Sequence, residues 1–325
     1  MKIIEGTQST IYMNEATRTV KKVGTERGKQ DTIDQIAFYL NLPENIRNIF
    51  PQIISYVNGP EEYSYTYNYI EFPNLRYLLL DGKFDKKWMS KIIYVMNYIT
   101  NSIHSIEKSE ASQDSIFETY VTRCKRRVDE TQNYIGHEID LLNVDVCING
   151  QTFSRPISRI IHFFEYNIDL LVPPYICTTH GQLGPSHIFL SEMDNRFTLI
   201  DPKGFMKLYD PVIDFCKIGK AMLFATEWLE ENRYDIEYTI QGKVVSVNKY
   251  DIDNYDFNQM QEFYLGILEH IPMFSDSRIK IRNMAMICAD LIGGLPFAYV
   301  SGGKTRVVAL LAQIALATSL LFCEL

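Results

Sequence analysis

Two short segments hold the side chains best suited to chemistry: His180, Gln182 and His187 lie in the first, and Asp201 lies in the second. Asp201 follows the apolar run 197–200 and precedes Pro-Lys-Gly, which is the pattern of a carboxylate at the end of a strand. A carboxylate there can project into a cleft and bind Mg²⁺, which prefers oxygen ligands. The alternative is an Asp that only opens a turn before Pro-x-Gly.

The spacing of these segments resembles the catalytic and metal-binding loops of kinase-fold small-molecule phosphotransferases. This group includes aminoglycoside phosphotransferases, choline kinases and capsule-biosynthesis sugar kinases; its first loop reads H-G-D-x-x-x-x-N and its second I-D, often I-D-P-R-G. The sequence here reads H-G-Q-x-x-x-x-H from His180 and I-D-P-K-G from Ile200. The resemblance covers roughly residues 5–270 and is best over 176–235. It implies a bilobal, protein-kinase-like α+β fold.

Gln182 stands where the family has the carboxylate that accepts or orients the proton of the acceptor hydroxyl. A Gln side chain cannot act as a general base, although its carbonyl oxygen can orient a hydroxyl. Loss of a general base typically costs roughly 10²–10⁴-fold in rate. His180 resembles the structural His of the motif, and a catalytic role for it is the alternative.

The resemblance makes Asp201 a metal ligand and places His187 where the family has an Asn ligand. An imidazole suits Mn²⁺ or Zn²⁺ better than Mg²⁺. Two readings therefore stay open: either the metal preference is shifted, or His187 only packs. The implied cofactors are ATP or GTP with Mg²⁺, or else Mn²⁺.

Alternation along the strand expected at 17–23 puts Val20 and Lys22 on the same face. The resemblance implies that Lys22 holds the nucleotide phosphates and that Val20 packs over the base. Gln35, in the helix that follows, stands where the family has a Glu that holds this Lys. A Gln can donate or accept a hydrogen bond there but cannot neutralise the ammonium.

Two further segments extend the resemblance. Residues 69–75 are similar to the hinge of the capsule-type sugar kinases, which implies a nucleotide contact for Glu71. Residues 209–217 are similar to the segment after their metal loop. Asp214 is implied there as the acidic residue that clamps the backbone of the catalytic loop.

The predicted elements are mostly strands early in the chain and mostly helices later in it. The early pattern predicts strands at 10–13 and 17–23, a helix at 31–40, and strands at 50–56 and 63–72. Helical periodicity then predominates, at 87–103, 114–134, 157–171, 212–230, 258–270 and 278–289, with a strand-like insert at 236–247. We therefore expect an N-lobe over residues 1–73 and a mainly helical C-lobe over residues 74–325.

Bulk properties narrow the possible partners and the compartment. A net charge of −8 argues against a broad nucleic-acid footprint. The six cysteines are widely spaced and the first residues show no apolar leader, so a reducing, cytoplasmic location is expected. The apolar stretch 307–323 is slightly short for a membrane span and carries Gln313, Thr318 and Ser319. We expect a buried helix rather than a membrane anchor.

The sequence thus predicts a nucleotide-dependent phosphotransferase acting on a hydroxyl of a small molecule, such as a sugar or an amino-sugar-like compound. A catalytically dead pseudokinase, serving as a nucleotide-binding or scaffold module, is the principal alternative, because Gln182, His187 and Gln35 all depart from the family pattern. Altered chemistry on the same fold, such as nucleotidyl transfer, is a further possibility.

Overall fold

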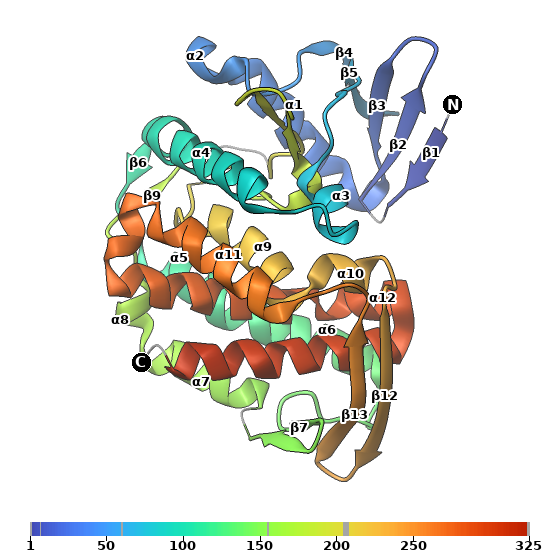
Figure 1. Cartoon of the computed structure of the whole chain (residues 1–325), viewed down its shortest axis with the longest axis vertical. Coiled ribbons are helices and arrows are strands. Elements are labelled where there is room, and N and C mark those ends of the chain that lie inside the picture. The colour runs from blue at the N-terminus through green and yellow to red at the C-terminus, as the bar shows by residue number, and fades with distance from the viewer. Residues whose placement is uncertain (1, 7, 60, 155, 204–207, 324–325) are drawn as a thin grey trace. The chain divides into compact units, whose positions relative to one another are not determined.

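The computed structural model describes residues 2–6, 8–59, 61–154, 156–203 and 208–323 (Figure 1). Its chain forms two compact units, residues 1–109 with 176–214 and residues 110–175 with 215–325. The lobe boundary expected at residue 73 stays a prediction. All candidate site residues belong to the first unit: Val20, Lys22, Gln35, Glu71, His180, Gln182, His187, Asp201 and Asp214.

A five-stranded antiparallel sheet begins the first unit, in the order β1-β2-β3-β5-β4. Its strands are β1 (Lys2–Glu5), β2 (Ser9–Asn14), β3 (Thr19–Gly24), β4 (Ile53–Asn58) and β5 (Tyr63–Asn68). The four predicted strands match β2 to β5. The sequence pattern does not predict β1, because this edge strand has four exposed residues and no alternation of buried and exposed positions.

The β2–β3 hairpin sets the register that positions Lys22. Asn14 Oδ1 accepts hydrogen bonds from the backbone N–H of Ala16 and Thr17, at 3.1 and 3.3 Å, which closes the predicted polar turn. Val20 lies opposite Met13 on one side and Tyr67 on the other. Residues directly opposite in a sheet share a face, so these side chains lie on the face that carries Lys22.

The first unit also contains α1 (Lys29–Asn41), α2 (Glu44–Arg47), α3 (Leu75–Leu80) and α4 (Lys86–Ser102). Asp85 caps α4 by accepting from the N–H of Lys87 and Trp88, and the predicted apolar face of α4 is buried. Two short antiparallel pairs complete the unit: β6 (Lys108–Ser109) with β9 (Ile176–Cys177), and β10 (Ile188–Leu190) with β11 (Phe197–Leu199).

The second unit is mainly helical. Its helices include α5 (Gln113–Phe117), α6 (Arg123–Ile135), α7 (Ile157–Tyr166), α8 (Ile168–Leu171), α10 (Thr226–Glu230) and α11 (Phe257–Glu269); α9 (Ile213–Phe224) starts at the end of the first unit. A four-stranded sheet accompanies them, in the order β12-β13-β7-β8: β12 (Tyr234–Gln241), β13 (Val244–Ile252), β7 (Asp145–Ile148) and β8 (Gln151–Phe153). The predicted strand insert is therefore a hairpin, and β13 also pairs in parallel with β7.

The last element, α12 (Ser277–Cys323), is two helical segments that meet at Gly303. Gly303 has φ 63°, a left-handed conformation that ends the first segment, and Figure 1 shows the second segment running back beside it. The predicted helix over 307–323 is present and most of it is buried. α12 alone, within the described residues, is long and apolar enough to cross a membrane, and 72% of its most apolar window is buried.

Candidate active site

Asp201 is separated from the end of β11 by one residue, Ile200. The backbone of Asp201 has a left-handed conformation, with φ 61°. Such a φ is uncommon for a residue other than Gly and is frequent at functional sites. The backbone N–H of Asp201 donates to Tyr39 Oη at 3.1 Å, which helps hold the turn. Burial alone would raise the pKa of Asp201, but Lys22 and then His187 favour the anion and leave this pKa below its usual value.

Lys22 is the ion-pair partner of Asp201, through Nζ and Oδ1. Both side chains are largely buried, with 10% and 25% of their side-chain surface exposed. Val20 and Lys22 lie on the same face of β3, as the alternation along the strand predicts. Val20 is buried on this face, with 5% of its surface exposed.

Gln35 does not take part in that ion pair. It projects from α1, where its Oε1 accepts a hydrogen bond from Tyr65 Oη at 3.0 Å. Tyr65 lies opposite Lys22 in the sheet, so the hydrogen-bond partner of Gln35 is a neighbour of Lys22. Within the described part of the chain, Lys22 pairs with Asp201 and no hydrogen bond joins it to Gln35.

Three tyrosines, Tyr39, Tyr65 and Tyr67, pack behind the Lys22–Asp201 pair. Ring centroids lie 5.5 Å apart for Tyr39 and Tyr65, and 5.9 Å apart for Tyr65 and Tyr67. Burial raises the pKa of each phenol, and the neighbouring negative charges raise it further. The three rings therefore stay neutral and supply hydrogen bonds and rigidity rather than charge.

Asp214 holds the backbone of the first loop. Its carboxylate accepts from the N–H of His180 at 3.0 Å and of Gly181 at 2.7 Å, and its Oδ2 lies 3.0 Å from His104 Nε2. Gly181 has φ 71°, and a Cβ there would lie 3.1 Å from Lys203 Cβ. Asp214 therefore fixes the loop through its two leading N–H groups, which is the clamping geometry expected of it.

His180 is fully buried and stacks on Phe50, with ring centroids 6.2 Å apart and an interplanar angle of 8°. Its Nδ1 accepts weakly from the N–H of Gln182, at 3.4 Å. Burial lowers the pKa of His180 to about 4, so the ring is neutral near pH 7. This placement is that of a packed, loop-supporting imidazole.

Gln182 borders a small cavity of about 50 Å³ that the loop shares with the sheet and α1. The lining includes Lys22, Gln35, Asp201 and Lys203, together with Gln8, Ser9, Gly28, Asp31 and Thr32. The structure thus brings the amide of Gln182, the ammonium of Lys22 and the carboxylate of Asp201 to one cavity. These are groups that can orient a hydroxyl, hold phosphate oxygens and bind a cation.

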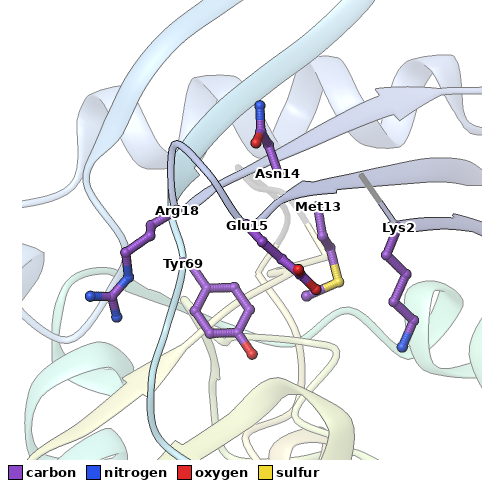
Figure 2. Close-up of a pocket in the computed structure, with 6 residues that line it drawn as sticks. All are labelled: Lys2, Met13, Asn14, Glu15, Arg18 and Tyr69. Carbon is purple, nitrogen blue, oxygen red and sulfur yellow. The ribbon is translucent and has the colours of Figure 1, made fainter.

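A larger hollow, of about 370 Å³, opens where the sheet meets the chain that leaves β5 (Figure 2). It is lined by Lys2, Met13, Asn14, Glu15, Arg18 and Tyr69. Figure 2 shows Met13, Glu15 and Lys2 extending to one side of Tyr69, while Arg18 extends to the other. Lys2 lies opposite Met13, and Met13 lies opposite Val20, so the hollow borders the sheet face that carries Lys22.

Glu71 lies near this hollow without lining it. Its carboxylate forms an ion pair with Arg18, and both side chains are 63% exposed. The expected nucleotide contact of Glu71 stays a prediction.

Asp201 and His187 lie close together, and the metal contact expected of them stays a prediction. The His187 Nε2 lies 3.5 Å from Asp201 Oδ2, and Asp201 Oδ1 is taken by Lys22. Within the described residues no group of three His, Cys, Asp or Glu side chains converges to hold a metal. Nucleotide phosphates and water would therefore have to supply the remaining ligands, as is common for Mg²⁺.

His104, Tyr39 and Tyr65 are site-supporting residues that the sequence does not predict. Each is buried and acts through another residue: His104 contacts Asp214, Tyr39 contacts Asp201, and Tyr65 contacts Gln35. The sequence gives little sign of these roles, because each residue occupies a position in the apolar pattern where an ordinary core residue is equally expected.

Comparison with solved structures relates this geometry to known folds. A thermostable mutant of aminoglycoside phosphotransferase APH(4)-Ia, in ternary complex with ADP and hygromycin B, has a TM-score of 0.59 at 9% identity, covering 98% of this chain and 93% of that one. The GDP complex of wild-type aminoglycoside 2'-phosphotransferase-IIIa has a TM-score of 0.58 at 11% identity, and the match covers 98% of this chain and 93% of that one. The gentamicin complex of APH(2")-IIa has a TM-score of 0.54 at 13% identity, and the match covers 95% of this chain and 88% of that one.

No protein-family model matches the sequence, and no curated protein matches it either. At these identities the structural likeness establishes the fold. The chain has the protein-kinase-like α+β fold of the aminoglycoside phosphotransferases, as the spacing of its two loops predicts.

Proposed function

We propose that this chain is a phosphotransferase that moves a phosphoryl group from ATP or GTP to a hydroxyl of a small molecule. The observation that carries the proposal is the convergence of Lys22, Asp201 and Gln182 on one cavity, beside a loop whose backbone Asp214 holds. Phosphoryl transfer asks mainly for positioning and electrostatic stabilisation, which these groups supply.

Lys22 would hold the phosphates, and Lys203 adds a second ammonium to the lining of the same cavity. A divalent metal, when bound, would offset the negative charge of the phosphates. Asp201 is already anionic beside Lys22, so the site is prepared for a cation without first losing a proton. The complexes of two structural neighbours with ADP and with GDP support a nucleotide at such a site.

The base would lie under Val20, toward the hollow bordered by Met13 and Tyr69. Val20 and Lys22 share one face of the sheet, so a nucleotide with its phosphates at Lys22 would have its base beside Val20. The polar rim of the hollow offers Lys2 and Glu15 to the outer edge of the ligand. Glu71 would reach the ligand only from beside the hollow, where it pairs with the lining residue Arg18.

Gln182 would orient the acceptor hydroxyl through its side-chain carbonyl. Because Gln182 cannot take the proton, the hydroxyl proton must pass to an oxygen of the transferred phosphoryl group or to water. Turnover should accordingly be slow. A sugar or amino-sugar-like acceptor is the class we propose, since structural neighbours bind hygromycin B and gentamicin.

A pseudokinase is the second candidate, and specific contacts favour it. Gln35 bonds Tyr65 and does not bond Lys22, whose ammonium pairs with Asp201. Together with the amide at Gln182, this leaves a site able to bind nucleotide with little means to activate the acceptor. Binding and turnover must therefore be measured separately.

Nucleotide binding is tested by thermal unfolding with ATP or GTP, each with Mg²⁺ or Mn²⁺. Stabilisation should be metal-dependent and should be lost in Asp201→Ala, while Asp253→Ala, at an exposed position, keeps it. No stabilisation of the native chain by either nucleotide would overturn the phosphotransferase and would leave only a scaffold module that binds no nucleotide.

Turnover is tested with γ-labelled nucleotide and a panel of sugars and aminoglycosides. The native chain should transfer label slowly, and Gln182→Asp should raise the rate at least about tenfold by restoring a base, given the roughly 10²–10⁴-fold worth of general-base catalysis. Binding without transfer in either form would favour the pseudokinase.

A further inference from the structure

We propose that His187 and Asp201 form a prearranged nitrogen–oxygen pair that takes a first-row transition-metal dication in preference to Mg²⁺. The proposal rests on the proposed function, because the nucleotide is expected to complete the coordination. It concerns which metal this chain selects, and it departs from the all-oxygen site implied by the H-G-D-x-x-x-x-N pattern.

The tautomer of His187 is fixed by its surroundings. Its Nδ1 lies 2.6 Å from the backbone carbonyl oxygen of Gln182, which also accepts from the N–H of Gly184 at 2.7 Å. A carbonyl oxygen only accepts, so Nδ1 carries the proton and donates it. A metal-binding His usually donates its other ring N–H to such a carbonyl or to a carboxylate. The ring of His187 thus presents Nε2 as its ligand atom.

Nε2 of His187 faces Asp201 Oδ2 at 3.5 Å. A direct charge-assisted hydrogen bond would be shorter, about 2.7–2.9 Å. Two ligand atoms that each lie about 2.1 Å from a shared metal are about 3.0–3.4 Å apart for angles from square to tetrahedral. The observed separation is therefore close to the spacing of two ligands on one ion.

The backbone holds the pair at this spacing. The N–H of His187 donates to Gly184 O at 2.9 Å, closing the 3₁₀ turn that begins at Pro185. The N–H of Ile200 donates to His187 O at 3.1 Å, which ties the residue before Asp201 to the His187 backbone. The backbone segments that carry the two ligands are thus joined by a hydrogen bond.

Lys22 limits what Asp201 can offer. Because Lys22 occupies Oδ1, Asp201 presents one oxygen, Oδ2, and the second protein ligand is an imidazole nitrogen. Mg²⁺ favours carboxylate, phosphate and water oxygens, whereas imidazole favours later first-row ions such as Co²⁺ and Zn²⁺. The donor set consequently disfavours Mg²⁺ relative to those ions.

The test uses Mn²⁺ as a paramagnetic probe on the full chain with ATP. Pulsed electron paramagnetic resonance should detect modulation from a directly bound ¹⁴N nucleus, and His187→Asn should abolish it. Binding competition should show the native chain taking Mn²⁺ or Co²⁺ over Mg²⁺, with His187→Asn reducing that preference at least about tenfold. His162→Asn, which alters an exposed imidazole, should change neither result.

The outcomes separate this proposal from the proposed function. Bound Mn²⁺ and nucleotide without ¹⁴N modulation in the native chain would overturn the nitrogen–oxygen site and leave the phosphotransferase standing. Nucleotide binding that is indifferent to metal would overturn the nitrogen–oxygen site and would also contradict the metal dependence expected of the proposed function. Absence of both nucleotide and metal binding would overturn both proposals.

Discussion

Individual residues of the site divide into those that face the cavity and those that hold them in place. Lys22, Gln182 and Asp201 line the cavity, whereas Asp214 and His180 act on the loop backbone. Asp214 satisfies two buried N–H groups at once, and leaving either unpaired would cost about 1–3 kcal/mol. The shape of the catalytic-type loop is therefore maintained even though its carboxylate has been replaced by Gln182.

The neutral, buried state of His180 makes stability depend on pH. Burial lowers its pKa to about 4 in the folded chain, whereas an unfolded His titrates near 6.5. Between those values the unfolded chain takes up a proton that the folded chain does not. This contribution is therefore complete above about pH 6.5 and is lost as the pH falls toward 4, amounting to about 3 kcal/mol.

Urea unfolding measured from pH 7 to pH 4 checks this expectation. The free energy of unfolding should fall more steeply for the native chain than for His180→Gln, which can still accept a hydrogen bond from the loop. His162→Asn, altering an exposed ring, should follow the native curve. Parallel curves for the native chain and His180→Gln would contradict the assignment.

At the scale of elements, one carboxylate joins three helices of the second unit. Asp290 of α12 contacts Lys217 Nζ at 2.8 Å and Lys220 Nζ at 2.9 Å on α9, and Arg123 of α6 at 3.5 Å. Burial alone would raise the pKa of Asp290, but the three cations hold it well below its usual value. Asp290 is the carboxylate that all three of these cations contact.

Asp290→Asn should destabilise the fold by about 3–5 kcal/mol, because it leaves the partly buried cations uncompensated. Chemical denaturation measures this loss. Asp235→Asn is the matched control, because Asp235 pairs with Lys249 at an exposed position and its loss should change stability far less. Equal losses in the two variants would show that the Asp290 cluster contributes no special stability.

The turn inside α12 depends on Gly303. Its φ of 63° disfavours any side chain, so Gly303→Ala should destabilise by about 1–2 kcal/mol, although the added Cβ meets open space. Gly294 is the control within the same element, where a Cβ would lie at an ordinary 3.5 Å from Leu310. Gly294→Ala should be neutral or stabilising by up to about 1 kcal/mol. Thermal unfolding of both variants decides whether the turn requires glycine.

At the scale of the whole molecule, the apolar end of the chain bears on where the protein resides. The most apolar window of α12 is 72% buried, and buried polar residues such as Gln313 and Thr318 lie within the helix. Gln313 Nε2 donates to the carbonyl of Phe224, a contact that ties the helix to α9. These contacts support our proposal that this helix is part of the core rather than a membrane anchor.

High-speed centrifugation of a detergent-free lysate tests the proposal. The chain should stay in the supernatant, and alkaline washing of the membrane fraction should release no further protein. Recovery only after detergent extraction would instead indicate insertion of the α12 segment into a membrane.

Local features of this protein could be predicted from its amino-acid sequence. Alternation placed Val20 and Lys22 on one strand face, and helical periodicity located the main helices. These two features follow from short-range rules, because the period of side chains along a strand or helix is fixed by the backbone. The kinase-like fold was implied by the resemblance of the two loops to those of the phosphotransferase family.

Tertiary structure alone decided which residues meet. In the folded chain Lys22 forms its ion pair with Asp201 and makes no hydrogen bond to Gln35. Tyr39, Tyr65 and His104 lie at the site, and β13 pairs in parallel with β7. Residue types and spacing do not encode such contacts, since they join positions far apart in the chain and depend on how packed elements compete for the same partners. The partner of Lys22 therefore became visible only when the sheet, α1 and the metal-type loop were assembled.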